Sequence, residues 1–215
     1  VAAYDINTAR LRAVAEETGI TPLTGPAEAA EWADMVLLAV KPNVIEAVVA
    51  EMGEALAGKA VLSIAAGWTT EKLRAILPEE SRVLFVIPNT PCMVGEGMAL
   101  AEDRSSFTEE ELGYAASLFS AIGQFKLVPP SVMNGASTLT GCGPAYLYLI
   151  IEALADGAVY QGVPRKLAYE LAAQTVIGAG KMVLESGLHP GELKDNVCSP
   201  GGTTIRGVRA MEDRG

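Results

Sequence analysis

Short, nearly unbroken apolar runs alternate with stretches of helical pattern through the first half of this chain. The apolar runs cover residues 1–4, 35–40, 60–64, 82–87 and 124–128. Helical patterns are predicted at residues 9–18, 26–33, 44–56, 70–77 and 108–122, whereas residues 88–97 are expected to form a loop. Strands that lack polar alternation are buried on both faces, as in βαβ units. The pattern therefore predicts an α/β domain with a mostly parallel sheet covered by helices.

The pattern changes after Pro129 and Pro130, where no further strand signal appears and three helices are expected. Pro144 and Pro164 lie at plausible first-turn positions of two of these helices. Gly162 and Gly187 lie at plausible helix ends. The second half is therefore predicted to be all helical.

These helices are apolar on nearly every side. Residues 146–160 carry only Glu152 and Asp156 as charged side chains, and residues 167–184 carry only Glu170 and Lys181. A helix of this kind has to be covered by other helices, in its own domain or in a partner subunit. A self-sufficient bundle is the alternative, but about 85 residues supply little surface for so much apolar area. We expect an oligomer.

Composition excludes several classes of protein. The 215-residue chain has a formal net charge of −10 and no dense run of Lys or Arg, so nucleic acid is not an expected partner. The longest strongly apolar run, residues 145–151, is short for a membrane span, and no membrane association is expected. Three widely spaced cysteines, Cys92, Cys142 and Cys198, argue against disulfides and a metal site and favour a cytoplasmic location.

Residues that directly follow the predicted strands are unusual in type. In an open parallel sheet, ligands bind outside the carboxyl ends of the strands. The first run ends in Asp5, and an acidic residue at such a position binds the adenosine ribose in dinucleotide folds. The next strands end in Lys41-Pro42-Asn43, Ala65-Ala66-Gly67 and Pro88-Asn89-Thr90-Pro91. Each could be an ordinary cap, turn or surface charge, but together they fit a flat cofactor lying across the sheet edge.

A second candidate site lies at Ser199-Pro200-Gly201-Gly202-Thr203-Thr204-Ile205, ahead of a helical stretch. The first N–H groups of a helix are unpaired and carry partial positive charge, so they bind small anions. Glycines allow a ligand to approach the backbone closely. The alternative is a plain turn with Thr203 or Thr204 as the N-cap. The single histidine, His189, is expected at a helix end rather than as a catalyst, and the cysteines are expected to be small fillers.

Five motifs in order make the chain similar to the pyrroline-5-carboxylate reductases. They are Ala39-Val40-Lys41-Pro42, Ser63-Ile64-Ala65-Ala66-Gly67, Pro88-Asn89-Thr90-Pro91, Gly141-Cys142-Gly143-Pro144-Ala145-Tyr146 and Ser199 to Ile205. The resemblance implies a Rossmann-like NAD(P)-binding domain at residues 1–129 and a helical dimerisation and substrate domain, of the 6-phosphogluconate dehydrogenase C-terminal type, at residues 130–215. It also implies a homodimer or a ring of dimers. Relative to the family, the first strand with its Gly-rich turn and the last helix would be missing. The chain departs from the family pattern at Pro130, Asn134 and Cys142.

The resemblance also implies roles for individual residues. The cofactor, NADPH or NADH, would be bound by Asp5 with Ile6, Lys41, Pro42, Asn43, Ala65, Ala66, Gly67, Asn89, Thr90 and Asn196. The substrate carboxylate would be bound by Gly201, Gly202, Thr203 and Thr204, and Thr204 would be the catalytic residue; no metal is implied. The implied reaction is reduction of 1-pyrroline-5-carboxylate to L-proline, the last step of proline biosynthesis.

Two other interpretations remain open at the level of the sequence. A related dehydrogenase of the β-hydroxyacid type would need a lysine on the long helix of the helical domain, and residues 145–162 contain none. A non-catalytic oligomeric ligand-binding protein would fit if the chain were complete from Val1. The reductase interpretation accounts for more of the motifs than either alternative.

Overall fold

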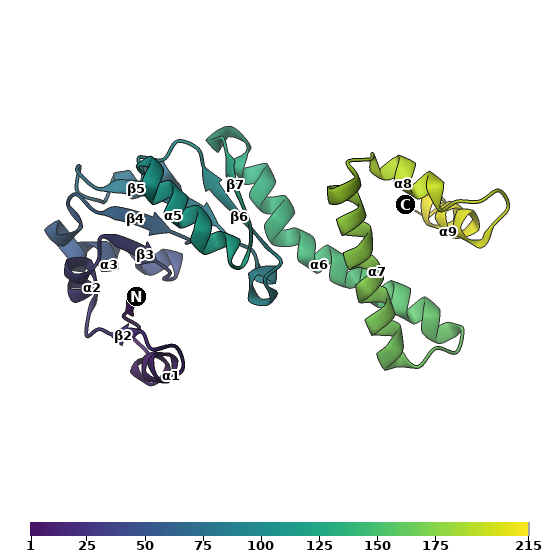
Figure 1. The fold of residues 1–215 in the computed structure, drawn as a ribbon, viewed down its shortest axis with the longest axis horizontal. Coiled ribbons are helices and arrows are strands. Elements are labelled where there is room, and N and C mark those ends of the chain that lie inside the picture. The colour runs from purple at the N-terminus through teal and green to yellow at the C-terminus, as the bar shows by residue number, and fades with distance from the viewer. Residues whose placement is uncertain (215) are drawn as a thin grey trace. The chain divides into compact units, whose positions relative to one another are not determined.

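The computed structural model describes residues 1–214, which form one compact unit from Val1 to Pro144 and a second from Ala145 onward (Figure 1). The strands are β1 (Ala2–Ala3), β2 (Thr21–Pro22), β3 (Met35–Leu38), β4 (Ala60–Ser63), β5 (Arg82–Ile87), β6 (Gly97–Glu102) and β7 (Gly123–Val128). The helices are α1 (Thr8–Thr18), α2 (Pro26–Trp32), α3 (Ile45–Met52), α4 (Thr70–Arg74), α5 (Glu109–Ser120), α6 (Pro130–Tyr160), α7 (Arg165–Ser186), α8 (Pro190–Asn196) and α9 (Thr203–Glu212). Short 3₁₀ helices occur at η1 (Pro42–Val44), η2 (Gly53–Leu56) and η3 (Thr90–Val94).

The main sheet of the first unit has the order β3-β4-β5-β6-β7. Neighbouring strands are parallel except for the antiparallel pair of β5 and β6, in which Val86 is opposite Ala101. The predicted mostly parallel α/β sheet is confirmed. The prediction missed β6, because its Gly and Ala residues carry little strand signal although most of the strand is buried. It also missed the two-residue β2, which pairs with β1 in a separate small sheet.

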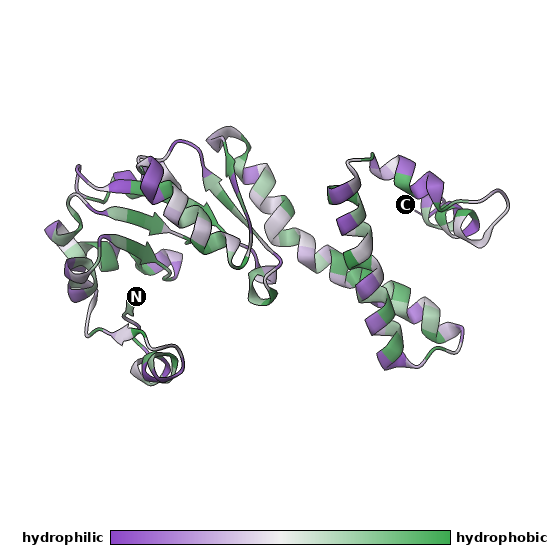
Figure 2. Cartoon of the chain, in the orientation of Figure 1, coloured by the Kyte–Doolittle hydropathy of each residue, from purple (hydrophilic) through white to green (hydrophobic). Residues whose placement is uncertain are grey.

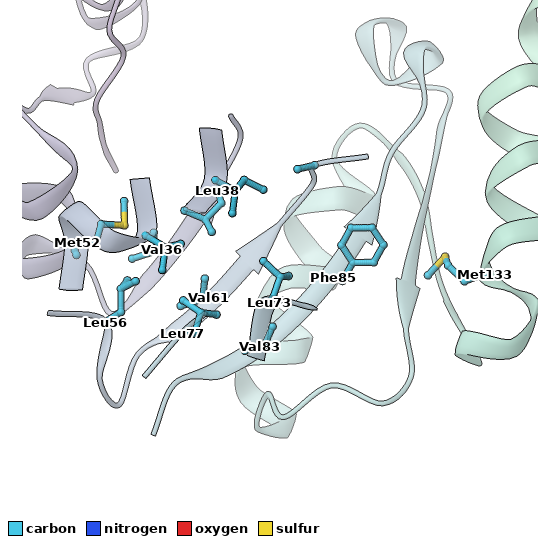
Figure 3. Close-up of a cluster of buried hydrophobic side chains, with 14 of the residues drawn as sticks. Val36, Leu38, Met52, Leu56, Val61, Leu73, Leu77, Val83, Phe85 and Met133 are labelled. Carbon is cyan, nitrogen blue, oxygen red and sulfur yellow. The ribbon is translucent and has the colours of Figure 1, made fainter. Parts of the chain in front are cut away.

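A buried cluster fixes helices on one face of the main sheet (Figure 3). Its strand residues include Val36, Val61, Val83 and Phe85, all at most 6% exposed. The helices and turns around them contribute further apolar side chains, namely Ile45, Val49, Met52, Leu56, Leu73, Leu77 and Met133. Burial of a Leu or Phe side chain contributes about 1.5–3 kcal/mol, so this cluster holds the strand ends in fixed positions.

Helix α5 is held against β5 and β7 by a polar and an apolar contact. Phe119 of α5 stacks on Phe125 of β7, with ring centroids 5.8 Å apart. At the other end of the helix, Thr108 and Glu111 form a capping box. The Glu111 carboxylate also accepts hydrogen bonds from the Arg82 guanidinium, whose Nε lies 2.9 Å from each carboxylate oxygen. This ion pair joins the start of α5 to the first residue of β5.

The helical half differs from the prediction in two ways. Pro144 lies inside α6 rather than in the first turn of a helix, so α6 is one helix of 31 residues. The prediction of three helices also missed the short α8. The predicted helix ends are confirmed, since Gly187 is the left-handed C-cap of α7 and Gly162, with φ of +94°, follows the end of α6.

Figure 2 shows that hydrophobic residues occur along much of α6 and α7. Many of their side chains are exposed in the single chain. Tyr148 and Leu149 of α6 are 61% and 66% exposed, and Leu171 of α7 is 53% exposed. By length and composition alone, α6 would be able to cross a membrane. The sequence prediction considered only the apolar run at residues 145–151, which Glu152 interrupts, whereas the helix extends from Pro130 to Tyr160. Core helices of other proteins pass the same test, so this is weak evidence for a membrane span.

Candidate functional site

The loops that follow β3 and β4 lie next to each other, because these strands are parallel and Leu38 is paired with Ser63. After β3, the exposed Lys41 precedes the 3₁₀ turn that begins at Pro42. After β4, Ala65 is buried, whereas Ala66 and Gly67 are exposed. Gly67 has a φ of +81°, and a Cβ built on it would have no atom within 4 Å. The backbone of this loop is therefore open to a ligand at Gly67. The left-handed conformation of Gly67 is disfavoured for residues with a side chain.

Side chains outside the predicted set hold these two loops. The Trp68 indole Nε1 donates to the Pro42 carbonyl oxygen over 3.1 Å, which joins one loop to the other. Lys72 Nζ donates to the Gly67 carbonyl over 2.8 Å. The Thr70 amide donates to Oε2 of Glu102, a carboxylate of β6 that is only 4% exposed. Sequence reasoning missed Trp68 and Glu102, because their partners lie 26 and 32 positions away and leave no local signal.

Asp5 follows β1, as predicted, and its carboxylate accepts a hydrogen bond from the Asn7 amide over 2.8 Å. Asn7 in turn caps α1 through its side chain, which accepts from the Arg10 amide. Ile6 is 89% exposed. One Asp5 oxygen thus helps to shape the turn into α1, and the role of Asp5 toward a ribose remains a prediction.

Both polar atoms of the Asn89 side chain form hydrogen bonds within the protein. Its Oδ1 accepts from the Met98 amide over 2.8 Å, and its Nδ2 donates to the Thr140 carbonyl over 2.9 Å. The Thr140 carbonyl would normally receive the backbone N–H of residue 144, but Pro144 has none. Asn89 therefore satisfies the acceptor that Pro144 leaves free, which is how α6 continues through the proline. Any contact of Asn89 with a nicotinamide would have to use its remaining hydrogen-bonding capacity, whereas Thr90 is exposed.

The predicted anion site forms a tight turn at the start of α9 in the second unit. Gly201 has a φ of +69°, and the Gly202 amide donates to the Ser199 carbonyl over 3.0 Å. A Cβ on Gly202 would lie 2.4 Å from Ser199 Oγ, so only glycine fits without a shift of that serine. Gly202 is the N-cap, and no side chain caps this helix. The alternative in which Thr203 or Thr204 is the N-cap is therefore wrong.

The segment ahead of this turn contains the other predicted residue of the second unit. Asn196 is the last residue of α8 and is exposed. The neighbouring Lys194 and Asp195 form an exposed ion pair of 2.9 Å, and the hydrogen bond that Lys194 donates to the Asp195 carboxylate raises the pKa of Lys194. Cys198, half-buried, lies between Asn196 and the glycine turn and is a free thiol.

His189 is the N-cap of α8, where its Nδ1 accepts from the Gly191 amide over 3.0 Å. This agrees with the prediction of a helix-terminal histidine. Among residues 1–214, no group of three or more His, Cys, Asp and Glu side chains is arranged to hold a metal ion. The thiols of Cys92 and Cys142 are also free.

The loops after β3 and β4 have two features that are typical of ligand-binding loops in α/β sheets. Residues 41–43 and 66–67 are exposed, with open space at the left-handed Gly67. Hydrogen bonds from Trp68 and Lys72 hold both loops. The carboxyl ends of parallel strands are where open α/β sheets usually bind ligands.

Known proteins match both halves of the chain. The family described as "Pyrroline-5-carboxylate reductase dimerisation" matches residues 130–215, and "NADP oxidoreductase coenzyme F420-dependent" matches residues 1–67. A pyrroline-5-carboxylate reductase of Methanosarcina acetivorans is 42% identical over 216 residues, which is 100% of this chain and 80% of that protein.

Solved structures of the same enzyme are similar as well. The Coxiella burnetii pyrroline-5-carboxylate reductase is 32% identical with a TM-score of 0.90, over 98% of this chain and 79% of that one. The Plasmodium falciparum pyrroline carboxylate reductase, solved with NADP bound, is 34% identical with a TM-score of 0.81, over 92% and 75% of the two chains. An Aspergillus terreus reductive aminase is 16% identical with a TM-score of 0.60, which shows a shared fold alone.

The matches to relatives extend over the whole chain, and one family match covers the helical half. The chain belongs to the pyrroline-5-carboxylate reductases, NAD(P)H-dependent oxidoreductases that act on a CH–NH group.

Proposed function

We propose that this reductase converts 1-pyrroline-5-carboxylate to L-proline, with the carboxylate held by the turn at Gly201, Gly202, Thr203 and Thr204. The observation that carries this assignment is the start of α9, where the N-cap is a glycine and no side-chain cap is present. The N-terminal end of a ten-residue helix favours a small anion through its N–H groups and its dipole. The first turn also contains no acidic residue that would repel a carboxylate.

The cofactor would be held by the loops of the first unit. Lys41, Pro42 and Asn43 would line it on one side and Ala65, Ala66 and Gly67 on the other, with Asp5 near the adenosine ribose. Asn89 and Thr90 would lie close to the nicotinamide, and Asn196 would also contact the cofactor. A reduced nicotinamide supplies a hydride to an electron-poor carbon.

The protein has little acid–base chemistry to perform in this reaction. The imine nitrogen of the substrate already carries a proton when the ring is activated, so the hydride adds to C5 and the C=N electron pair moves to nitrogen. The residues therefore have to hold the substrate, exclude water and keep the reacting carbons about 3–3.5 Å apart. The Thr204 hydroxyl, exposed in the first turn of α9, would donate to the carboxylate or contact the ring nitrogen.

Oligomeric state, location and domain limits belong to the same proposal. The exposed apolar faces of α6 and α7 fit a homodimer, or a ring of dimers, in which the domain at residues 130–215 provides the interface. The domain at residues 1–129 would bind the cofactor. Three free thiols and a net charge of −10 fit a cytoplasmic enzyme that binds neither nucleic acid nor membranes.

The test follows oxidation of NADPH and of NADH in the presence of the cyclic imine, with wild-type protein and Thr204→Ala. The substitution removes a hydroxyl that contacts only the substrate, so kcat/KM for the imine should fall by about tenfold or more while the cofactor Kd stays within about twofold. Unchanged kinetics would remove Thr204 from the site. A side-by-side titration also tests Asp5, since its carboxylate should repel the 2′-phosphate and a strong preference for NADPH would contradict its role.

A further inference from the structure

We infer that Trp68 is a positioning residue that joins the two cofactor loops and thereby sets the affinity for the dinucleotide. The inference rests on the proposed assignment of Lys41–Asn43 and Ala65–Gly67 to the cofactor. Trp68 itself is not one of the assigned residues. It directly follows Gly67, and its indole N–H reaches the Pro42 carbonyl, 26 positions earlier in the chain.

The ring of Trp68 is held in place by its surroundings. It is half-buried and packs against the core cluster that lies under β3, β4 and β5. Its backbone N–H donates to the Ala65 carbonyl over 3.3 Å, which closes the Ala65–Trp68 turn. The Trp68 ring thus packs against the core, while its indole N–H is bonded to Pro42 in the loop after β3.

The loop after β3 has few other restraints of its own. Lys41, Pro42, Asn43 and Val44 are all exposed, and the Val44 amide donates to the Lys41 carbonyl over 3.0 Å. The loop after β4 is restrained more strongly, because Lys72 and Glu102 hold its carbonyl and amide groups. The hydrogen bond from the Trp68 indole to Pro42 therefore restrains the loop after β3 by joining it to the loop after β4.

A loop that is ordered before binding costs less entropy when the cofactor arrives. Loss of one hydrogen bond of this kind costs about 0.5–1.5 kcal/mol, which corresponds to about a 2- to 10-fold change in an equilibrium constant. The effect should appear in cofactor affinity, since the substrate carboxylate is assigned to α9.

The first experiment compares Trp68→Phe with Trp32→Phe, which alters the other tryptophan of the chain, 55% exposed at the end of α2. Phenylalanine keeps an aromatic ring against the core but has no N–H. Trp68→Phe should raise the cofactor Kd and KM about 2- to 10-fold and leave the imine KM, and kcat at saturating cofactor, within about twofold. Trp32→Phe should change none of these. An unchanged cofactor Kd in Trp68→Phe overturns the inference, and so does an equal loss in kcat and both KM values.

The second experiment needs neither cofactor nor turnover. Amide hydrogen exchange of the free protein should become faster at Lys41, Asn43 and Val44, the residues of this loop with a backbone N–H, in Trp68→Phe and stay at the wild-type rate in Trp32→Phe. Equal protection of residues 41–44 in both variants would contradict the coupling. If instead the wild-type protein binds neither NADPH nor NADH, the proposed function fails, and the exchange data still decide whether Trp68 joins the loops.

Discussion

Gly202 is the N-cap of α9 and Gly207 lies inside this helix, and a side chain at each position would meet different surroundings. A Cβ at Gly202 would lie 2.4 Å from Ser199 Oγ and 3.1 Å from the Ser199 carbonyl, whereas a Cβ at Gly207 has nothing within 4 Å. Gly202→Ala should displace Ser199, alter the anion-binding turn and lower kcat/KM for the imine by about tenfold or more. Gly207→Ala, the matched control, should leave kcat/KM within about twofold and stabilise the helix slightly. Equal activity of the two variants in a steady-state assay would contradict the assignment.

Asn89 and Pro144 form a second pair of residues that can be tested together. Asn89→Asp keeps the acceptor for the Met98 amide but loses the donor to the Thr140 carbonyl, so it should destabilise the protein by about 1–3 kcal/mol. In a Pro144→Ala background the backbone N–H gained at this position can serve the Thr140 carbonyl, and the same change should cost about 1 kcal/mol less. Urea unfolding of the four proteins measures this coupling. Strict additivity would show that Asn89 does not compensate for the proline.

Among the elements, α5 is joined to β5 by an ion pair that makes its stability depend on pH. The Arg82 guanidinium lowers the pKa of Glu111, helped by the amide of Thr108. Because the folded-state pKa lies below the unfolded one, the pair stabilises the fold above the ordinary Glu pKa and is lost as pH falls through the lowered value.

Glu111→Gln isolates this charge, because glutamine also satisfies a capping box. At pH 7 it should lower the free energy of unfolding by about 1 kcal/mol, since the pair is partly exposed. The difference from wild type should shrink as the pH falls from the ordinary Glu pKa, about 4.3, through the lowered value of Glu111. Denaturant unfolding at several pH values measures it, with Glu110→Gln as the control, an exposed neighbour on the same helix. A difference independent of pH would exclude the ion pair as the cause.

For the molecule as a whole, the exposed apolar faces of α6 and α7 are the feature that points to self-association, because a single chain does not cover them. Leu149 of α6 is 66% exposed within the segment that matches a dimerisation family. Leu149→Glu should weaken self-association by at least about tenfold and lower Tm at a given protein concentration. Trp32→Lys changes an apolar residue of similar exposure, 55%, outside that segment and should leave the association unchanged. Light scattering over a concentration series measures both, and a Leu149→Glu protein with wild-type association would contradict an interface at this position.

Features that depend on local pattern were predictable from the amino-acid sequence. Unbroken apolar runs indicate strands buried on both faces, and this is why the α/β sheet was predictable. The glycine turn before α9 was recognisable because φ above zero and close packing on Ser199 demand glycine at fixed neighbouring positions. The assignment of this turn to the substrate carboxylate stays a prediction.

Features that depend on partners far apart in the chain arise only when the chain folds. The strand β6 is weak by propensity and forms because β5 and β7 pair with it on either side. Pro144 is expected to begin a helix, yet α6 continues through it, because Asn89, 51 positions from Thr140, supplies the missing hydrogen bond. Trp68 carries no motif, and its bond to Pro42 exists only once β3 and β4 are in register. A hydrogen bond between distant residues depends on strand register and helix packing, which no local window of sequence contains.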